Sequence, residues 1–281
     1  MASMEITTRI GCKIACVYCP QKKLIEAYSQ RSNIFQMTFD VFKKCLEKMP
    51  EEVNIDFGGF CEPWLNPEAT EMVSFAHEKG HKVYIYTTLV GMKLQDIDLL
   101  ESVNPNGFTL HLPSAGNDEH IEVDENYLNL LDRLLKSKIK FGAKFQGDNL
   151  DPKLEIFMKD RKVVDQSRPH TRASNITIGK RPNPKRRRHR MICKHNLENN
   201  VLLPNGDVAL CCMDYGLKHV LGNLLSSGYD SLFSGKEFLF VKEGLKDDSL
   251  DILCRYCEEY ARHPLNKHLK KLKASMRRRI L

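Results

Sequence analysis

Short apolar segments rich in β-branched residues alternate, over residues 5–178, with segments whose apolar side chains recur every three or four positions. The apolar segments are typical of strands, and the periodic segments are typical of amphipathic helices. Strands that alternate with helices indicate right-handed crossovers and a parallel sheet. The predicted strands lie at residues 5–10, 53–57, 82–87, 107–112 and 140–146. The predicted helices lie at residues 38–48, 67–79, 96–102 and 126–137.

Helix boundaries and strand spacing refine this picture. Thr38 is a predicted N-cap, Pro67 is predicted in the first turn of the next helix, and Gly80 is predicted just after that helix. After the first strand, the strands begin about 30 residues apart, as expected for βαβ units. A closed barrel of eight such units takes about 250 residues, which is too long for this region. We therefore predict an α/β fold with a partial (β/α)6 TIM-like barrel.

The chain changes character over residues 167–190, which hold three prolines and many basic residues but little periodicity. This composition predicts a boundary. The first domain is expected at residues 1–175, and a second, smaller domain at residues 176–281.

The second domain has its own pattern. Apolar segments at residues 200–203 and 207–211 flank the sequence "PNG", which predicts a hairpin. Residues 229–245 predict a helix or a pair of helices, and a basic helix is expected at the C-terminus.

Composition limits the function classes. No apolar run approaches the ~20 residues of a membrane helix. The first ten residues lack the apolar core of a signal peptide. We therefore expect a cytoplasmic protein with no membrane partner.

The formal net charge of +7 comes from two short stretches, residues 180–190 and 267–279, each with seven Lys or Arg residues and no acidic residue. The remainder of the chain is net acidic. Neither stretch holds the interleaved aromatic side chains that stack on single-stranded nucleic acid. A nucleic-acid partner is therefore less favoured than a small-molecule substrate.

Eight of the ten cysteines fall into two groups, at residues 12–19 and 193–257. Disulfide frameworks belong to small oxidised domains, so clustered cysteines in this chain indicate metal binding. Cys12, Cys16 and Cys19 have the spacing C-x3-C-x2-C directly after the first strand. A structural zinc site needs four ligands, whereas a [4Fe–4S] cluster held by three thiolates leaves one iron open. A zinc knuckle completed from elsewhere in the chain is the alternative.

This triad, in this place, resembles the signature of the radical SAM (S-adenosylmethionine) superfamily. The resemblance implies that Cys12, Cys16 and Cys19 hold a catalytic [4Fe–4S] cluster. It also implies reductive cleavage of SAM to a 5′-deoxyadenosyl radical, which abstracts hydrogen from a substrate C–H bond. An electron donor such as flavodoxin or ferredoxin is then a partner.

The same resemblance assigns cofactor-binding residues. Tyr18 matches an aromatic position that packs near the adenine, and "DFGGFCEP" looks like the family's Gly-Gly-Glu segment. Gly58 and Gly59 would then approach the methionine moiety, and Glu62 would meet its ammonium group. Ser114, after the fourth strand, would reach the ribose. Thr87 and Thr88 stand where relatives carry a different motif, so their role stays open.

The second cysteine group resembles the SPASM/Twitch class of C-terminal extensions. That resemblance implies one auxiliary [4Fe–4S] cluster, so the chain would hold two clusters in all. The register of the segment favours Cys211 over Cys212 as a ligand. A zinc ion with four thiolates is the alternative. The expected ligands are Cys193, Cys211, Cys254 and Cys257.

The whole layout is similar to radical SAM dehydrogenases of 2-deoxystreptamine (butirosin) biosynthesis. It implies an oxidoreductase that dehydrogenates, or otherwise modifies, a sugar, aminocyclitol or nucleotide-sugar. Arg172, in "TRASN", would contact the substrate or lie near the auxiliary cluster. Modification of a ribosomal peptide or of RNA is the alternative enzyme activity. The non-enzyme alternative is a zinc or iron–sulfur protein that binds nucleic acid.

Overall fold

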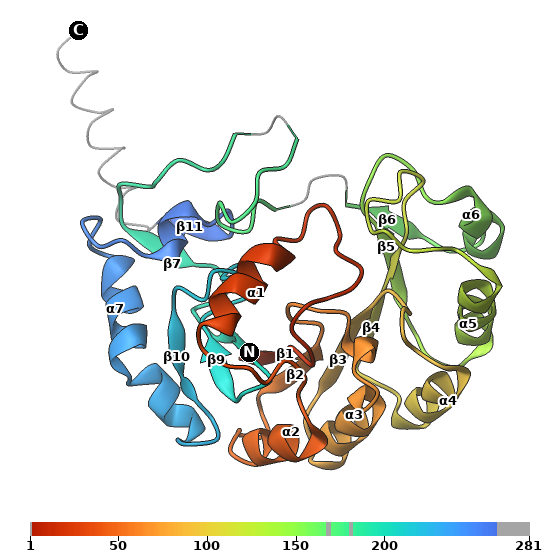
Figure 1. Ribbon diagram of the computed structural model, residues 1–281, viewed down its shortest axis with the longest axis horizontal. Helices are drawn as coiled ribbons and strands as arrows, with labels where there is room; N and C mark the ends of the chain where they lie inside the picture. The colour runs from red at the N-terminus through yellow and green to blue at the C-terminus, as the bar shows by residue number, and fades with distance from the viewer. Residues whose placement is uncertain (1, 167–169, 180–181, 263–281) are drawn as a thin grey trace, which may run out of the picture.

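The computed structural model describes residues 2–166, 170–179 and 182–262 (Figure 1). A curved sheet runs through it, and its nine strands lie in the order β10-β9-β8-β1-β2-β3-β4-β5-β6. Helices α2 to α6 lie along the outer side of this sheet (Figure 1). Within the described residues, no helix is long and apolar enough to cross a bilayer.

Six parallel strands form the first part of the sheet, as the sequence predicts. Their positions agree with the predicted strands to within a few residues, and the predicted sixth unit is present. The strands are β1 (Ser3–Ile6), β2 (Asn54–Phe57), β3 (Val83–Thr87), β4 (Gly107–Leu112), β5 (Gly142–Phe145) and β6 (Val163–Asp165). The predicted partial barrel is therefore confirmed.

The predicted helices are also present, with one difference in a predicted boundary. Thr38 caps α2, since its Oγ1 accepts a hydrogen bond from the Val41 amide at 3.3 Å. Pro67 does not lie in the first turn of α3, as predicted, because Glu68 is the N-cap residue and the helix begins after it. Gly80 follows the end of α3 with a φ of +88°, as expected of a residue that ends a helix. The helices of this region are α1 (Gln21–Ser29), α2 (Phe39–Leu46), α3 (Ala69–Glu78), α4 (Leu94–Val103), α5 (Glu125–Lys136) and α6 (Pro152–Met158).

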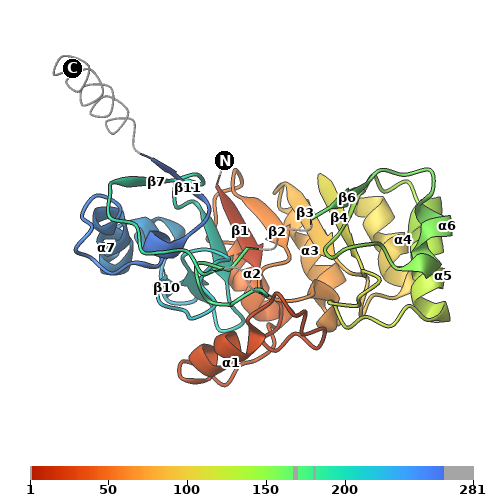
Figure 2. The same ribbon diagram turned by 90° about the horizontal axis from the view of Figure 1, so that it is seen from above.

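The second region continues the same sheet. Strand β8 (Asn199–Leu202) pairs with β1 in parallel, and it forms the predicted hairpin with β9 (Asp207–Ala209). Gly206 in the turn has a φ of +85°, where a Cβ would lie 2.7 Å from Leu225 Cγ. Figure 2 shows this region beside β1, at the opposite end of the sheet from β6.

Short elements complete the second region. The predicted pair of helices corresponds to a 3-10 helix, η2, followed by α7. A separate two-stranded sheet joins β7 to β11. The basic C-terminal stretch, residues 267–279, lies outside the described residues. The remaining elements are β7 (Met191–Cys193), β10 (Val220–Asn223), η2 (Tyr229–Phe233), α7 (Lys236–Gly244), η3 (Leu253–Tyr256) and β11 (Tyr260–Arg262); η1 (Pro63–Leu65) belongs to the first region.

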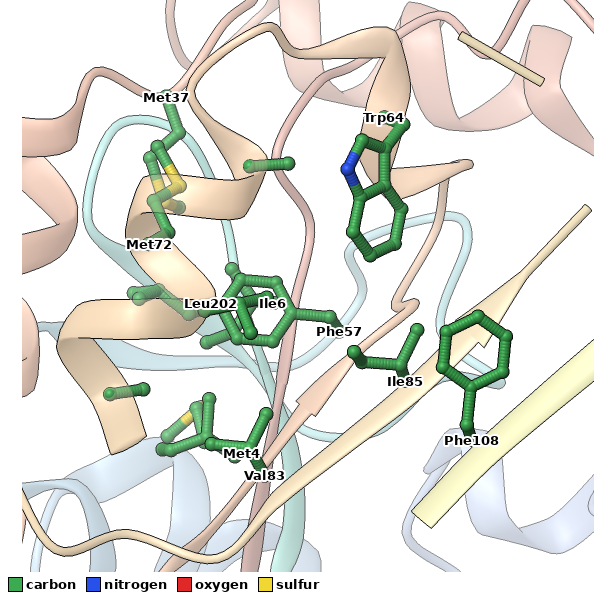
Figure 3. Close-up of a cluster of buried hydrophobic side chains, with 14 of the residues drawn as sticks. Met4, Ile6, Met37, Phe57, Trp64, Met72, Val83, Ile85, Phe108 and Leu202 are labelled. Carbon is green, nitrogen blue, oxygen red and sulfur yellow. The ribbon is translucent and has the colours of Figure 1, made fainter. Parts of the chain in front are cut away.

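The core lies between the sheet and its outer helices (Figure 3). Ile6, Phe57 and Ile85 are buried there, each on a different strand. Side chains alternate between the two faces of a strand. The intervening positions therefore face the concave side, and they are polar: Glu5 on β1 and Asp56 on β2 are examples. Parallel strands usually read as continuous apolar runs, so this polar face requires a functional explanation.

Candidate active site

A cavity of about 430 Å³ occupies the concave side of the six parallel strands. Its volume is in the range of small-molecule sites. Cys12, Cys16 and Cys19 border it, as do Glu5 and Asp56 from the strands. The first cysteine group and the polar face of the sheet therefore share one space.

Gln21, the first residue of α1, holds the cysteine loop in place. Its Nε2 donates to Cys19 Sγ at 3.2 Å and to the Phe60 carbonyl oxygen at 2.6 Å. Its Oε1 accepts a hydrogen bond from the Cys12 amide at 3.3 Å. The sequence analysis missed Gln21, although its place two residues after Cys19 is a local signal.

The three thiols suit a metal cluster. Burial and the neighbouring Cys19 raise the pKa of Cys16 to about 12, and burial also raises the pKa of Cys12. Thiols that raise one another's pKa lie close together, and metal binding would deprotonate them. Among the described residues, no three His, Cys, Asp or Glu side chains converge on a single-ion site. Soft donors around a space are the donor set of an iron–sulfur cluster.

Tyr18 and Ser114 meet in one hydrogen-bond network. The Tyr18 hydroxyl donates to Glu119 Oε1 at 3.1 Å. The Ser114 amide and hydroxyl both donate to Glu119 Oε2 at 2.9 Å. The structure thus ties the Ser114 hydroxyl to Glu119, a residue that the sequence analysis did not identify, while Tyr18 borders the cavity.

The segment after β2 carries Gly59 and Glu62 to the cavity. Gly59 has a φ of +55°, and a Cβ there would lie 2.5 Å from Thr7 Oγ1. Glu62 is buried and accepts hydrogen bonds from Thr87 Oγ1 at 2.7 Å and from the Thr88 amide at 2.6 Å. Burial nevertheless raises the pKa of Glu62 to about 7. Thr87 and Thr88, whose role stayed open, therefore position Glu62; Gly58 also borders the cavity.

Two carboxylates form one end of the polar face. Glu5 and Asp56 are partners in the β1–β2 register. Burial raises the pKa of Glu5 to about 7, and Asp56 adds to that rise. Burial raises the pKa of Asp56 to about 6. The sequence analysis missed both residues, although each stands between apolar residues of a predicted strand.

Basic side chains lie at the other end of the same face. His111 and Lys144 are partners in the β4–β5 register, and both border the cavity. Burial, reinforced by the positive charges nearby, lowers the pKa of His111 to about 3 and that of Lys144 to about 8. Tyr86, on β3 between the two ends, has Lys144 Nζ 5.7 Å from its ring centroid.

Arg172 reaches the cavity from the segment between the two regions. Residues 172–174 have φ values of +50°, +53° and +68°, so the chain turns in a left-handed conformation. The Arg172 guanidinium lies 5.9 Å from the ring centroid of Tyr215, and within the described structure its buried Nε has no hydrogen-bond partner. Burial opposes the charge of Arg172, but Tyr215, Cys212 and other acidic neighbours raise its pKa overall.

The second cysteine group borders another cavity, of about 170 Å³. Burial, Cys212 and Cys254 raise the pKa of the Cys211 thiol. Cys212 borders both cavities, and after burial the largest influence on its pKa is Glu5. The thiols around the smaller cavity, other than Cys212, are Cys193, Cys211, Cys254 and Cys257.

A buried histidine positions one of these cysteines. His219 Nε2 accepts a hydrogen bond from the Leu253 amide, next to Cys254, at 3.0 Å. This bond assigns the ring proton to Nδ1, which donates to Glu237 Oε1 at 2.5 Å. No sequence motif marks His219, because its partners lie far along the chain.

Residues 193–258 match the family model of the SPASM iron–sulfur cluster-binding domain. A comparison with curated proteins finds no match. Among solved structures, BtrN in complex with AdoMet and 2-DOIA is 17% identical, covers 92% of this chain and 93% of its own, and has a TM-score of 0.63.

Two further structures share the fold. AnSMEcpe with bound AdoMet is 13% identical over 91% of this chain and 83% of its own, with a TM-score of 0.57. SuiB of Streptococcus suis, bound to the precursor peptide SuiA, is 12% identical over 84% of this chain and 65% of its own, also with a TM-score of 0.57. The predicted resemblance is confirmed at the level of the fold: residues 193–258 match the SPASM family model, and the chain shares the fold of BtrN, anSMEcpe and SuiB.

Proposed function

We propose that this chain is a radical SAM enzyme whose reaction takes place in the larger cavity. The observation that carries this proposal is that Cys12, Cys16 and Cys19 border the same cavity as a row of charged strand residues. With SAM bound, a [4Fe–4S] cluster on three thiolates supplies reductive cleavage of the sulfonium and a radical that abstracts hydrogen from a C–H bond.

The chain's own residues position SAM. Gly58 and Gly59 allow the backbone to approach the methionine moiety, and Glu62 faces its ammonium group. Tyr18, held by Glu119, packs near the adenine, and Ser114 belongs to the same network. Because Thr87 and Thr88 donate hydrogen bonds to Glu62, its carboxyl group is oriented before SAM binds, and the ammonium group of SAM would favour its ionised form.

The second cysteine group holds an auxiliary [4Fe–4S] cluster in the domain proposed at residues 176–281; the partial barrel is residues 1–175. Its proposed ligands are Cys193, Cys211, Cys254 and Cys257. Cys211 is preferred because it borders the smaller cavity and not the larger one, whereas Cys212 borders both.

The substrate is proposed to be a small polar molecule such as a sugar, aminocyclitol or nucleotide-sugar, which the enzyme dehydrogenates with Arg172 in contact. A flavodoxin- or ferredoxin-like protein would donate electrons. The polar face of the cavity and the 2-DOIA bound to BtrN support this class. A peptide substrate is the second candidate, since anSMEcpe and SuiB have structures with bound peptides.

Part of the basic run is engaged within the protein, which makes an RNA substrate less favoured. Arg186 Nη2 donates to the carbonyl oxygens of Asp248 and Leu250, at 2.6 and 3.2 Å. Arg187 lies over the Tyr260 ring, 4.0 Å from its centroid. Arg186 and Arg187 are therefore engaged in contacts within the second region, whereas Lys185, Arg188 and Arg190 of the same run are exposed.

Replacing Cys12, Cys16 and Cys19 together with Ala is expected to remove about four of about eight irons per chain, because one of two four-iron clusters loses its ligands. Cleavage of SAM to 5′-deoxyadenosine should be lost as well. Iron analysis and a cleavage assay after anaerobic reconstitution measure both. Cys45→Ala, which changes a buried thiol outside both groups, is the control. Zinc in the loop of the wild type, or cleavage by the triple variant, would contradict the proposal.

Cys211 and Cys212 provide a matched pair of adjacent residues. Cys211→Ala is expected to lose about four irons, whereas Cys212→Ala should keep about eight, because only Cys211 is a proposed ligand. Iron content and the electron paramagnetic resonance spectrum of the reduced protein distinguish them. The reverse result would reassign the ligand.

Glu62→Gln is expected to weaken SAM binding while the iron content stays unchanged. Hydrogen bonds to charged groups contribute about 1.5–3 kcal/mol, which corresponds to about 10- to 150-fold in affinity. Equilibrium binding to the reconstituted protein measures this, with the exposed Glu78→Gln as the control. Equal affinities in Glu62→Gln and the wild type would remove Glu62 from the SAM site.

A further inference from the structure

We propose that Glu5 and Asp56 form a subsite for a primary ammonium group of the substrate, at the β1–β2 end of the larger cavity. This inference rests on the proposed function, because it names the chemistry of that enzyme's substrate. The shared chemistry is a protonated amine, and its carrier is an amino-sugar or aminocyclitol, or the lysine side chain of a peptide.

Geometry makes the two carboxylates a pair. They occupy partner positions on adjacent parallel strands, so both side chains leave the sheet on the same face. Strands lie about 4.8 Å apart, which brings two carboxylates within reach of one small cation. Neither forms a salt bridge in the part of the chain that the structure describes. Their hydrogen-bonding neighbours are neutral groups, the Cys212 thiol for Glu5 and the Ser3 hydroxyl for Asp56. Two buried carboxylates without a salt-bridged cation are costly, and a bound cation would remove that cost.

The basic side chains of the cavity neutralise the two carboxylates only in part. His111 on β4 lies two strands from Asp56, which is about 10 Å at the usual strand spacing. Lys144 lies one strand further, and the Tyr86 ring is beside it. Arg172 offsets part of the Glu5 charge, since it lowers the pKa of that carboxyl, but burial outweighs it.

The unpaired groups at the basic end point to the same ligand. Arg172 borders the cavity with a buried Nε that has no hydrogen-bond partner among the described residues. His111 and Lys144 border it beside Arg172. These donors fit substrate hydroxyl, carbonyl or phosphate oxygens, while the carboxylates fit the amine. A molecule with an amine at one side and oxygens at the other satisfies both ends.

An ammonium fits the acidic end better than a hydroxyl does. A hydroxyl group has one hydrogen to donate, so it leaves the second carboxylate without a donor. An ammonium group has three hydrogens and a positive charge, so it can bind both carboxylates with charge-assisted hydrogen bonds.

The subsite also fixes which way the substrate lies. Glu5, Asn199 and Cys212 border both cavities and form the partition between them. Cys12, Cys16 and Cys19 border only the larger of these two. The substrate amine is therefore held beside the second cysteine group.

Isothermal titration calorimetry on the reconstituted protein with SAM tests the subsite. The probes are glucosamine, N-acetylglucosamine, glucose and the side-chain amine of Nα-acetyl-lysine amide. At least one amine should bind ten times or more tightly than N-acetylglucosamine and glucose, because acetylation removes the charge. Preference for glucosamine assigns a sugar-like substrate, and preference for the lysine derivative assigns a peptide. Equal binding of amines and neutral probes, or no binding of either amine, overturns the proposal.

Double variants test whether Glu5 and Asp56 are the residues that bind the amine. Glu5→Gln combined with Asp56→Asn should reduce the affinity for the amine about tenfold or more and abolish the preference over the acetylated probe. Glu122→Gln combined with Glu125→Gln, two exposed carboxylates, is the matched control. An unchanged preference in the first double variant overturns the assignment. If the wild-type protein binds the amine but does not cleave SAM, the proposed function is rejected and the subsite is not.

A second measurement separates a binding role from a structural one. Without substrate, Glu5→Gln should raise the melting temperature by a few degrees at pH 8 and change it little at pH 5. The groups that face Glu5 are Asp56, Cys212 and Arg172, and burial raises its pKa to about 7. Since the ordinary pKa of a glutamic acid is 4.5, the destabilising effect of the wild-type carboxyl grows between about pH 4.5 and 7, so it is small at pH 5 and complete at pH 8. A lower melting temperature for the variant at pH 8 would show that Glu5 stabilises the fold instead.

Discussion

The parallel pairing of β1 with β8 determines how the two cysteine groups lie relative to each other. Ser3 pairs with Asn199 and Ile6 with Leu202, so a strand of the second region forms the neighbour of the first barrel strand. The cysteine loop follows β1 directly, and the second group flanks the hairpin of β8 and β9. Because one continuous sheet carries both, the two cavities are neighbours, and Glu5, Asn199 and Cys212 border both of them.

The two faces of this sheet have opposite chemistry. The outer face is an ordinary apolar core, with Ile6, Phe57 and Ile85 packed under the helices. The concave face carries charges whose pKa values burial moves toward the neutral form, upward for Glu5 and downward for Lys144. Such a face lowers stability in the absence of ligand and is typical of binding sites. The apolar face stabilises the fold, and the polar face is where the proposed function places the substrate.

Local patterns in the sequence predicted much of the fold. The strand at Gly107–Leu112, the Thr38 cap and the hairpin turn at Gly206 depend on neighbouring residues, so the chain displays them directly. Helix α1 was missed because it begins two residues after Cys19, inside what reads as a loop. The pairing of β1 with β8 joins residues nearly two hundred positions apart, and parallel pairing leaves no turn signal between them. Glu5 and Asp56 were visible as acidic residues within apolar strands, but only the register shows that they are neighbours.

The same long-range contacts bind the first cysteine group to the second region. Cys19 Sγ accepts a hydrogen bond from Gln21 Nε2 at 3.2 Å and lies 3.3 Å from the Tyr215 hydroxyl, which comes from the second region. Tyr215 in turn packs on Phe60, whose carbonyl oxygen also accepts from Gln21. Hydrogen bonds to a ligating sulfur influence the properties of the metal group it holds. The second region therefore does more than carry its own cysteines: through Tyr215 it forms part of the environment of Cys19, and a shift of that region would change both sites together.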